Sequence, residues 1–88
     1  MQFEWDDNKA KSNQKKHQIS FEEATTVWTD TLALIAPDPE HSLTEEREWI
    51  IGESYQGRLL VVVYTMRGDI IRIISARLAT KREKKQYE

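Results

Sequence analysis

LLVVVYT at residues 59–65, the turn RGD at 67–69 and the run IIRIISAR at 70–77 give the clearest indication of the fold. The first run is apolar without interruption as far as Tyr64, which is typical of a central strand covered on both faces. The glycine of the RGD turn then allows the chain to reverse. The sequence therefore predicts a hairpin at the centre of a sheet.

Three further strands are predicted nearer the N-terminus from alternating or short apolar patterns, over residues 2–5, 32–36 and 46–51. Pro37-Asp38-Pro39 ends the second of these strands, and the polar residues 40–45 predict a loop. A Gln56-Gly57 turn leads from the third strand into the central hairpin.

Two helices are predicted between the first and second strands. Asp6 offers a side-chain oxygen to cap a helix over residues 7–17. Ser20 and Glu23 have the spacing of a capping box at the start of the next helix. The apolar stripe of that helix consists of Phe21, Ala24, Val27 and Trp28.

A third, short and basic helix is predicted through Tyr87, because Thr80 and Glu83 repeat the capping-box spacing. The elements then follow the order β-α-α-β-β-β-β-α. This order implies an α+β fold with a small antiparallel sheet and helices mostly on one side of it.

The helix predicted over residues 7–17 has no apolar stripe. At about 100° per residue, one of its faces carries Lys9, Ala10, Asn13, Lys16 and His17. Only Ala10 is apolar among them. This helix must be held by polar contacts and aliphatic stems, or else expose the face to a polar partner.

The 88 residues contain no cysteine and only two histidines, His17 and His41. Disulfides, thiolate zinc sites and a cysteine nucleophile are thereby excluded, and we expect neither a metal nor another cofactor. A chain of this length is expected to form one domain over residues 1–88, with any function on its surface. No apolar run approaches the roughly 20 residues that span a bilayer, so we expect a cytoplasmic protein with no membrane partner.

The net charge of −2 conceals a separation of charge along the chain. Residues 20–57 carry nine acidic side chains and one basic one, whereas residues 58–87 carry eight basic side chains and two acidic ones. The basic part can hold a polyanion or an acidic partner, although a solvated surface with uneven charge is the ordinary explanation.

Short motifs stand in order along the whole chain: FEWD at 3–6, Lys9-Ala10, Asn13, Lys16-His17, SFEEA at 20–24, EER at 45–47, Ile51-Gly52, GRLLVVV at 57–63, RIISAR at 72–77, and Arg82-Glu83 with Tyr87. Together they resemble BrnT-type toxins of bacterial type II toxin–antitoxin systems. Gln18 departs from the glycine that usually follows Lys-His in that family. A left-handed conformation at this position would cost strain for Gln.

The resemblance implies a RelE-like fold and a metal-independent ribonuclease activity that arrests translation. It also implies a BrnA-type antitoxin as the partner that neutralises the toxin. Such antitoxins carry a DNA-binding segment of ribbon-helix-helix type, so operator DNA is expected to be bound only through the antitoxin.

Metal-free cleavage of RNA needs a base for the 2′-hydroxyl proton, an acid for the leaving 5′-oxygen and cations for the charge on the phosphate. We expect Arg67 at the hairpin tip and Arg77 near a strand end to clamp that phosphate. Arg72, five residues before Arg77, is expected on the opposite face, and the sequence barely separates these two arginines. Surface ion pairs with acidic residues are the alternative role for all three.

His17 is the candidate acid or base, because imidazole exchanges protons near neutral pH. Lys16 beside it is a candidate phosphate ligand. The competing interpretation is a histidine that caps the end of its helix. Glu23 or Glu22 is the reserve base, although Glu23 also suits the capping box and the helix dipole.

Lys9 and Asn13 continue the polar stripe of the first helix and can follow an RNA backbone. With Arg72, Lys81 and Arg82 they form the predicted RNA-binding set. The three tryptophans can stack on bases, but in so small a core we expect them to be structural.

Two other functions stay open. The chain can be a noncatalytic interaction module, whose basic hairpin and C-terminal helix bind an acidic segment of a partner protein. It can also be a degenerate toxin that binds its antitoxin but no longer cuts RNA.

Overall fold

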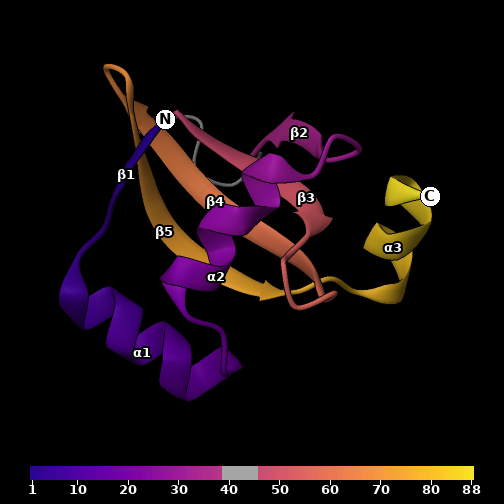
Figure 1. Cartoon of the computed structure of the whole chain (residues 1–88), viewed down its shortest axis with the longest axis horizontal. Coiled ribbons are helices and arrows are strands. Elements are labelled where there is room, and N and C mark those ends of the chain that lie inside the picture. Colours follow the sequence, from indigo (N-terminus) through magenta and orange to yellow (C-terminus); the bar gives the residue numbers. More distant parts are fainter. Residues whose placement is uncertain (39–45) are drawn as a thin grey trace.

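The computed structural model describes residues 1–38 and 46–88, and these contain five strands and three α-helices (Figure 1). In chain order the elements are β1 (Gln2–Glu4), α1 (Asp7–His17), α2 (Phe21–Thr25), the 3-10 helix η1 (Thr26–Thr29), β2 (Leu34–Pro37), β3 (Arg47–Glu53), β4 (Leu59–Arg67), β5 (Ile70–Leu78) and α3 (Lys81–Tyr87). The predicted order is confirmed. The loop predicted over residues 40–45 lies outside the described residues.

The second predicted helix is divided into α2 and η1. The hydroxyl of Thr26 donates to the Glu23 carbonyl at 2.7 Å, and the hydroxyl of Thr29 donates to the Thr26 carbonyl at 2.7 Å. Such bonds compete with the regular helical pattern, and the chain tightens into η1. The predicted apolar stripe is confirmed, because three of its members are fully buried and Trp28 packs against the core.

The strands form one sheet in the order β1-β5-β4-β3-β2. The pairs β2–β3, β3–β4 and β4–β5 are antiparallel, whereas β1 pairs parallel with β5, with Phe3 opposite Ile71. The sheet is therefore mixed, and the expectation of a purely antiparallel sheet is wrong. A strand of three residues carries too little alternation to specify its neighbour. Here the position of β1 is fixed by tertiary contacts such as that of Phe3 with Trp28.

One face of the sheet, called the core face below, packs against α2 and η1. Its buried side chains include Leu60, Val62 and Tyr64 from β4, and Ile73 and Ala76 from β5. Apolar surface removed from water in this way is the main stabilising contribution to a small domain.

Two tryptophans belong to this core. The Trp28 ring makes edge-to-face contacts with Phe3 at 5.2 Å and with Tyr64 at 5.0 Å between ring centres. Trp5 makes a similar contact with Phe21 at 5.9 Å. The predicted structural role is confirmed for Trp5 and Trp28, while the third tryptophan lies on the other side of the sheet.

The opposite face, called the open face below, carries Val61, Val63, Thr65 and Arg67 of β4 and the residues paired with them on β3 and β5. It is covered at one end, where α3 lies against β3, and Val61 is fully buried. Val62 on the core face is fully buried as well. The prediction that this strand is covered on both faces is thus confirmed at that end.

α1 runs beside β5 (Figure 1). The Asn13 side chain attaches the helix to that strand. The Asn13 amide donates to the carbonyls of Ala76 at 2.9 Å and Ile19 at 3.0 Å, and it accepts from the Ala76 N–H at 3.0 Å. Because β1 reaches only residues 70–72 of β5, Asn13 takes the place of a neighbouring strand at Ala76. This explains how a helix without an apolar stripe is held.

The predicted helix caps form with one difference. Asp6 accepts from two backbone N–H groups of the first turn of α1, at 2.8 and 3.0 Å. At α3, Thr80 and Glu83 exchange both hydrogen bonds of the capping box. At α2, Ser20 accepts from the Glu23 N–H, but the Glu23 carboxylate binds other residues.

Gln18 ends α1 in the left-handed conformation, with φ 59° and ψ 36°. A residue with a Cβ pays roughly 1 kcal/mol in this conformation, and glycine does not. Gln18→Gly is therefore expected to raise the free energy of unfolding by about 0.5–1 kcal/mol, measured by urea denaturation. Gln18→Ala keeps the Cβ and should stay near the parent protein. A less stable glycine variant would contradict the assignment of strain.

Candidate functional site

A β-bulge in β5 shapes the open face. Val63 and Tyr64 are adjacent on β4, yet the residues opposite them are Ser75 and Ile73. Ile74 is therefore the extra residue and has no partner on β4. Such a residue shifts the alternation of its strand by one position and redirects the side chains that follow.

The bulge places Arg72 and Arg77 on the same face of the sheet. Arg72 lies opposite Thr65 and Arg77 lies opposite Val61, and these two β4 residues share the open face. The expectation that the two arginines point to opposite faces is therefore wrong. It assumed a regular strand, in which residues five apart alternate.

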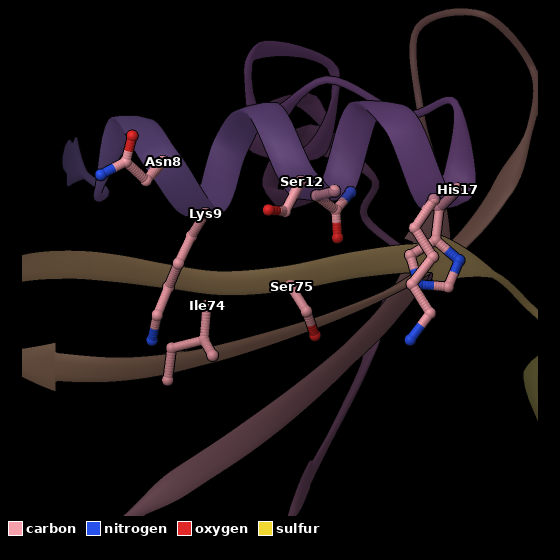
Figure 2. A pocket seen from close by; sticks show the side chains of 8 residues that line it. Asn8, Lys9, Ser12, His17, Ile74 and Ser75 are labelled. Atoms are coloured by element: carbon pink, nitrogen blue, oxygen red, sulfur yellow. The ribbon is translucent and has the colours of Figure 1, made fainter.

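Two hollows meet at the bulge. The first, of about 370 Å³, lies between α1 and β5 and is lined by Asn8, Lys9, Ser12, Asn13, Lys16, His17, Ile74 and Ser75 (Figure 2). The second, of about 310 Å³, lies on the open face and is lined by Asp38, Arg47, Trp49, Val63, Ile74, Ser75 and Arg77. Both hollows share Ile74 and Ser75, so they adjoin. We call this combined surface the bulge site.

The α1 wall of the bulge site is cationic. Lys9 and Lys16 are exposed and His17 is half-buried. In the part of the chain that the structure describes, their side chains make no hydrogen bond or ion pair. Figure 2 shows Lys9 and His17 toward the two ends of the helix segment that faces Ile74 and Ser75. The competing interpretation of His17 as a helix cap has no hydrogen bond to support it among these residues.

Arg77 provides the cation on the other side of the bulge. Its guanidinium donates to the two carboxylate oxygens of Glu83 at 2.7 and 2.9 Å and lies 6.0 Å from the centre of the Trp49 ring. Hydrogen bonding between the two side chains raises the pKa of Arg77 and lowers the pKa of Glu83 to about 2. Arg77 Nη1 also donates to the Leu78 carbonyl at 3.3 Å. Since a guanidinium has five N–H donors, these three hydrogen bonds orient Arg77 and still leave two donors for a ligand.

This ion pair is expected to make stability depend on pH in acid. The pKa of Glu83 is 4.5 for the free carboxyl group and about 2 in the folded protein. Its contribution is complete above pH 4.5 and is lost as the pH falls toward 2. We expect a contribution of about 2 kcal/mol, a discounted value because Arg77 is 35% exposed. On acidification from neutral to strongly acidic pH, the free energy of unfolding should therefore fall less in Glu83→Gln than in the parent. Urea denaturation at the two pH values measures both changes. Equal losses would contradict the assignment.

Arg67 lies far from the bulge site. It is six residues along β4 from Val61, which lies opposite Arg77. At about 3.4 Å per residue this separation is about 20 Å. The prediction that Arg67 and Arg77 clamp one phosphate is therefore wrong. Arg67 instead shares the Glu4 carboxylate with Arg72.

Glu23 has a structural role in place of the predicted catalytic one. Its buried carboxylate accepts from the Ser54 hydroxyl at 2.7 Å and from Arg58 Nε at 3.0 Å, with a further contact to Arg58 Nη2. These hydrogen bonds, chiefly that of Arg58, lower the pKa of Glu23. A carboxylate held by a guanidinium is a poor general base. Glu23 also lines neither hollow.

The predicted RNA-binding residues are divided by the structure. Lys9 lines the bulge site, and Arg72 lies on the open face beyond it. Asn13 lines the first hollow, but its amide is buried and bonded to backbone, so its role is structural. Lys81 and Arg82 are exposed on α3 and line neither hollow.

Several residues that line the bulge site were not predicted as site residues, among them Ser75, Trp49 and Arg47. The alternation of a regular strand cannot reveal a residue that follows a bulge. The position of Ser75 inside the RIISAR motif is the signal that points to it in the sequence.

The described residues also limit two other kinds of site. Among residues 1–38 and 46–88, no three His, Cys, Asp or Glu side chains gather in a way that could hold a metal ion. In the same part of the chain, every helix is too short or too polar to cross a membrane.

Comparison with known proteins identifies the family. A family profile described as "Ribonuclease toxin, BrnT, of type II toxin-antitoxin system" matches residues 5–83. The chain belongs to the BrnT family. The resemblance seen in the sequence is thereby confirmed, and membership of a BrnT-type toxin–antitoxin system implies an antitoxin as partner. The matched range contains α1 and β5, the two elements that form the first hollow.

A solved structure agrees with this assignment of fold. The ribonuclease toxin BrnT of Brucella abortus, known at 1.1 Å resolution, is similar to this chain with a TM-score of 0.72 and 24% sequence identity. The alignment covers 92% of this chain and 99% of the Brucella chain. No curated protein matches the chain. The α+β fold of a BrnT-family protein is therefore shown.

Proposed function

We propose that this BrnT-family toxin is an endoribonuclease that cleaves RNA at the bulge site by metal-independent acid–base chemistry. The observation that carries the proposal is that two hollows share Ile74 and Ser75 and bear cations on both sides. A phosphodiester seated over Ser75 would have Lys16 and His17 on one side and Arg77 on the other. Those groups match the needs of phosphodiester cleavage.

The proposed reaction is an attack of the 2′-oxygen on the adjacent phosphorus, with breakage of the bond from phosphorus to the 5′-oxygen. A base takes the 2′-hydroxyl proton and an acid protonates the 5′-oxygen, which leaves a 2′,3′-cyclic phosphate and a 5′-hydroxyl. His17 performs one of these two transfers, and water in the open hollow is available for the other. Lys16 and Arg77 stabilise the negative charge that builds on the phosphate oxygens.

The biological part of the proposal follows from the family and the cationic surface. Cleavage of RNA in the cytoplasm arrests translation, and a BrnA-type antitoxin blocks the bulge site. That antitoxin carries a ribbon-helix-helix segment. The toxin–antitoxin complex binds operator DNA only through this segment. A RelE-like fold belongs to the same proposal.

Incubation of the purified toxin with RNA in the presence of a chelator tests the chemistry. The expected products carry 2′,3′-cyclic phosphate ends and form at an undiminished rate without divalent metal. Cleavage that a chelator abolishes, or intact RNA throughout, would contradict the proposal.

Overproduction of the toxin separates it from a noncatalytic interaction module. Growth arrest is expected when the toxin is produced alone, with recovery when its antitoxin is supplied. Unimpeded growth together with a stable complex of toxin and one partner protein would favour the interaction module or a degenerate toxin.

A further inference from the structure

Two arginines converge on one carboxylate at the hairpin end of the open face. Arg72 Nη1 lies 2.6 Å and Arg67 Nη1 lies 3.2 Å from the same oxygen, Oε2 of Glu4. Two positive charges therefore share one negative charge, and the group keeps a net positive charge. The Arg67 side chain is 61% exposed, so its guanidinium is accessible to a further anion.

This arginine pair lies on the same face as Arg77 because of the bulge. Arg77 lies opposite Val61 of β4, and Arg72 lies opposite Thr65, four residues farther along that strand. Arg67 is itself a β4 residue, six positions from Val61. At about 3.4 Å per residue, these separations are about 14 and 20 Å. One phosphate cannot span that distance, whereas a short stretch of extended polyanion can.

The surface between the two cationic ends has an apolar floor. Trp49, Val63 and Ile74 are half-buried and line the second hollow. Cations that follow a backbone, combined with an aromatic and apolar floor that accepts bases, are typical of surfaces that bind single-stranded nucleic acid. On the neighbouring wall, Lys9 and Lys16 of α1 continue the positive charge along the first hollow.

We propose that Arg67 and Arg72 form a second phosphate-binding subsite, which holds single-stranded RNA a few nucleotides away from the bond cleaved at the bulge site. This inference rests on the proposed function and specifies its substrate as an extended single strand. Glu4 holds the two guanidiniums together, and the exposed side of Arg67 faces the RNA phosphate. The ordinary alternative is an ion pair that only fastens β1 to the hairpin.

The subsite is tested by measuring the binding of RNAs in which one phosphate at a time is replaced by an uncharged linkage. The bond cut by the parent toxin is first mapped, and an RNA blocked there by a 2′-O-methyl group then receives one methylphosphonate at each position in turn. A methylphosphonate at the blocked bond is expected to weaken binding to the parent protein about fivefold. A methylphosphonate at one remote position is expected to weaken it by the same factor. In Arg67→Gln the remote effect should disappear and the effect at the blocked bond should persist. Lys15→Gln, the matched loss of charge, should keep both effects.

Salt dependence and stability provide two further readouts. Arg67→Gln removes one phosphate contact. The slope of log RNA affinity against log salt concentration should therefore become shallower by about 0.7, the value per contact for single strands. The urea midpoint of Arg67→Gln should equal that of the parent, because an accessible RNA contact is not needed for folding. A lowered midpoint with an unchanged salt slope would overturn the subsite and support the fastening role.

The outcomes also separate this inference from the proposed function. If the parent toxin cleaves RNA but no remote position responds to the neutral linkage, the subsite is overturned and the proposed function stands. If Arg67→Gln keeps the full remote effect, the subsite is likewise overturned. If the parent toxin does not cleave RNA at all, the proposed function itself fails.

Discussion

His17→Ala is expected to lower the rate constant of RNA cleavage, kcat, by about 10²–10⁴-fold, the usual worth of a positioned acid or base. The imidazole makes no hydrogen bond or ion pair within the described part of the chain. Its removal should therefore leave the fold intact and change the chemistry. Steady-state cleavage of a labelled RNA at saturating concentration measures kcat, and thermal unfolding of the variant checks the fold.

Lys15→Ala is the control for this experiment, since it changes an exposed residue of the same helix outside both hollows. Its kcat should match that of the parent toxin. A folded His17→Ala variant with undiminished kcat would remove His17 from the mechanism. Chemical rescue by added imidazole would support a proton-transfer role, which a merely structural histidine would not show.

Asn13→Ala is expected to lower the free energy of unfolding by about 3 kcal/mol. The substitution removes three buried hydrogen bonds and leaves the N–H and carbonyl of Ala76 and the carbonyl of Ile19 without partners. Each buried group left unsatisfied costs about 1–3 kcal/mol, partly offset where water can enter. The loss is large for a domain of this length, whose total stability is on the order of 5–10 kcal/mol.

Urea denaturation measures the loss, and hydrogen exchange of the Ala76 amide locates it. Asn8→Ala is the matched control, because Asn8 lines the same hollow but is exposed. It should change the unfolding free energy by less than about 0.5 kcal/mol. A stability of Asn13→Ala equal to that of Asn8→Ala would show that Asn13 does not hold α1 against β5.

The elements of this fold could be predicted because their signals are local. The caps at Asp6 and Thr80, the apolar run of β4 and the turn at Gly68 each act within a few residues. The parallel pairing of β1 could not be predicted in this way, because it depends on contacts between residues about 70 positions apart, such as Phe3 and Ile71.

The candidate site was predicted less completely for a related reason. The structure brings the predicted residues Lys16, His17 and Arg77 to two adjoining hollows, whereas Arg67, which was predicted to join them, lies at the far end of the sheet. Strand register and the bulge at Ile74 decide these distances, and neither leaves a pattern in a single sequence. The pairing of Glu23 with Arg58 is equally nonlocal.

Titration of isotope-labelled toxin with an uncleavable 2′-O-methyl RNA, followed by NMR, shows directly whether RNA binds at the bulge site. We expect the largest changes in amide chemical shift at His17, Ser75 and Arg77, with smaller changes at Arg67 and Arg72. Shifts confined to α3 and β2, with the residues around the bulge unchanged, would contradict this expectation.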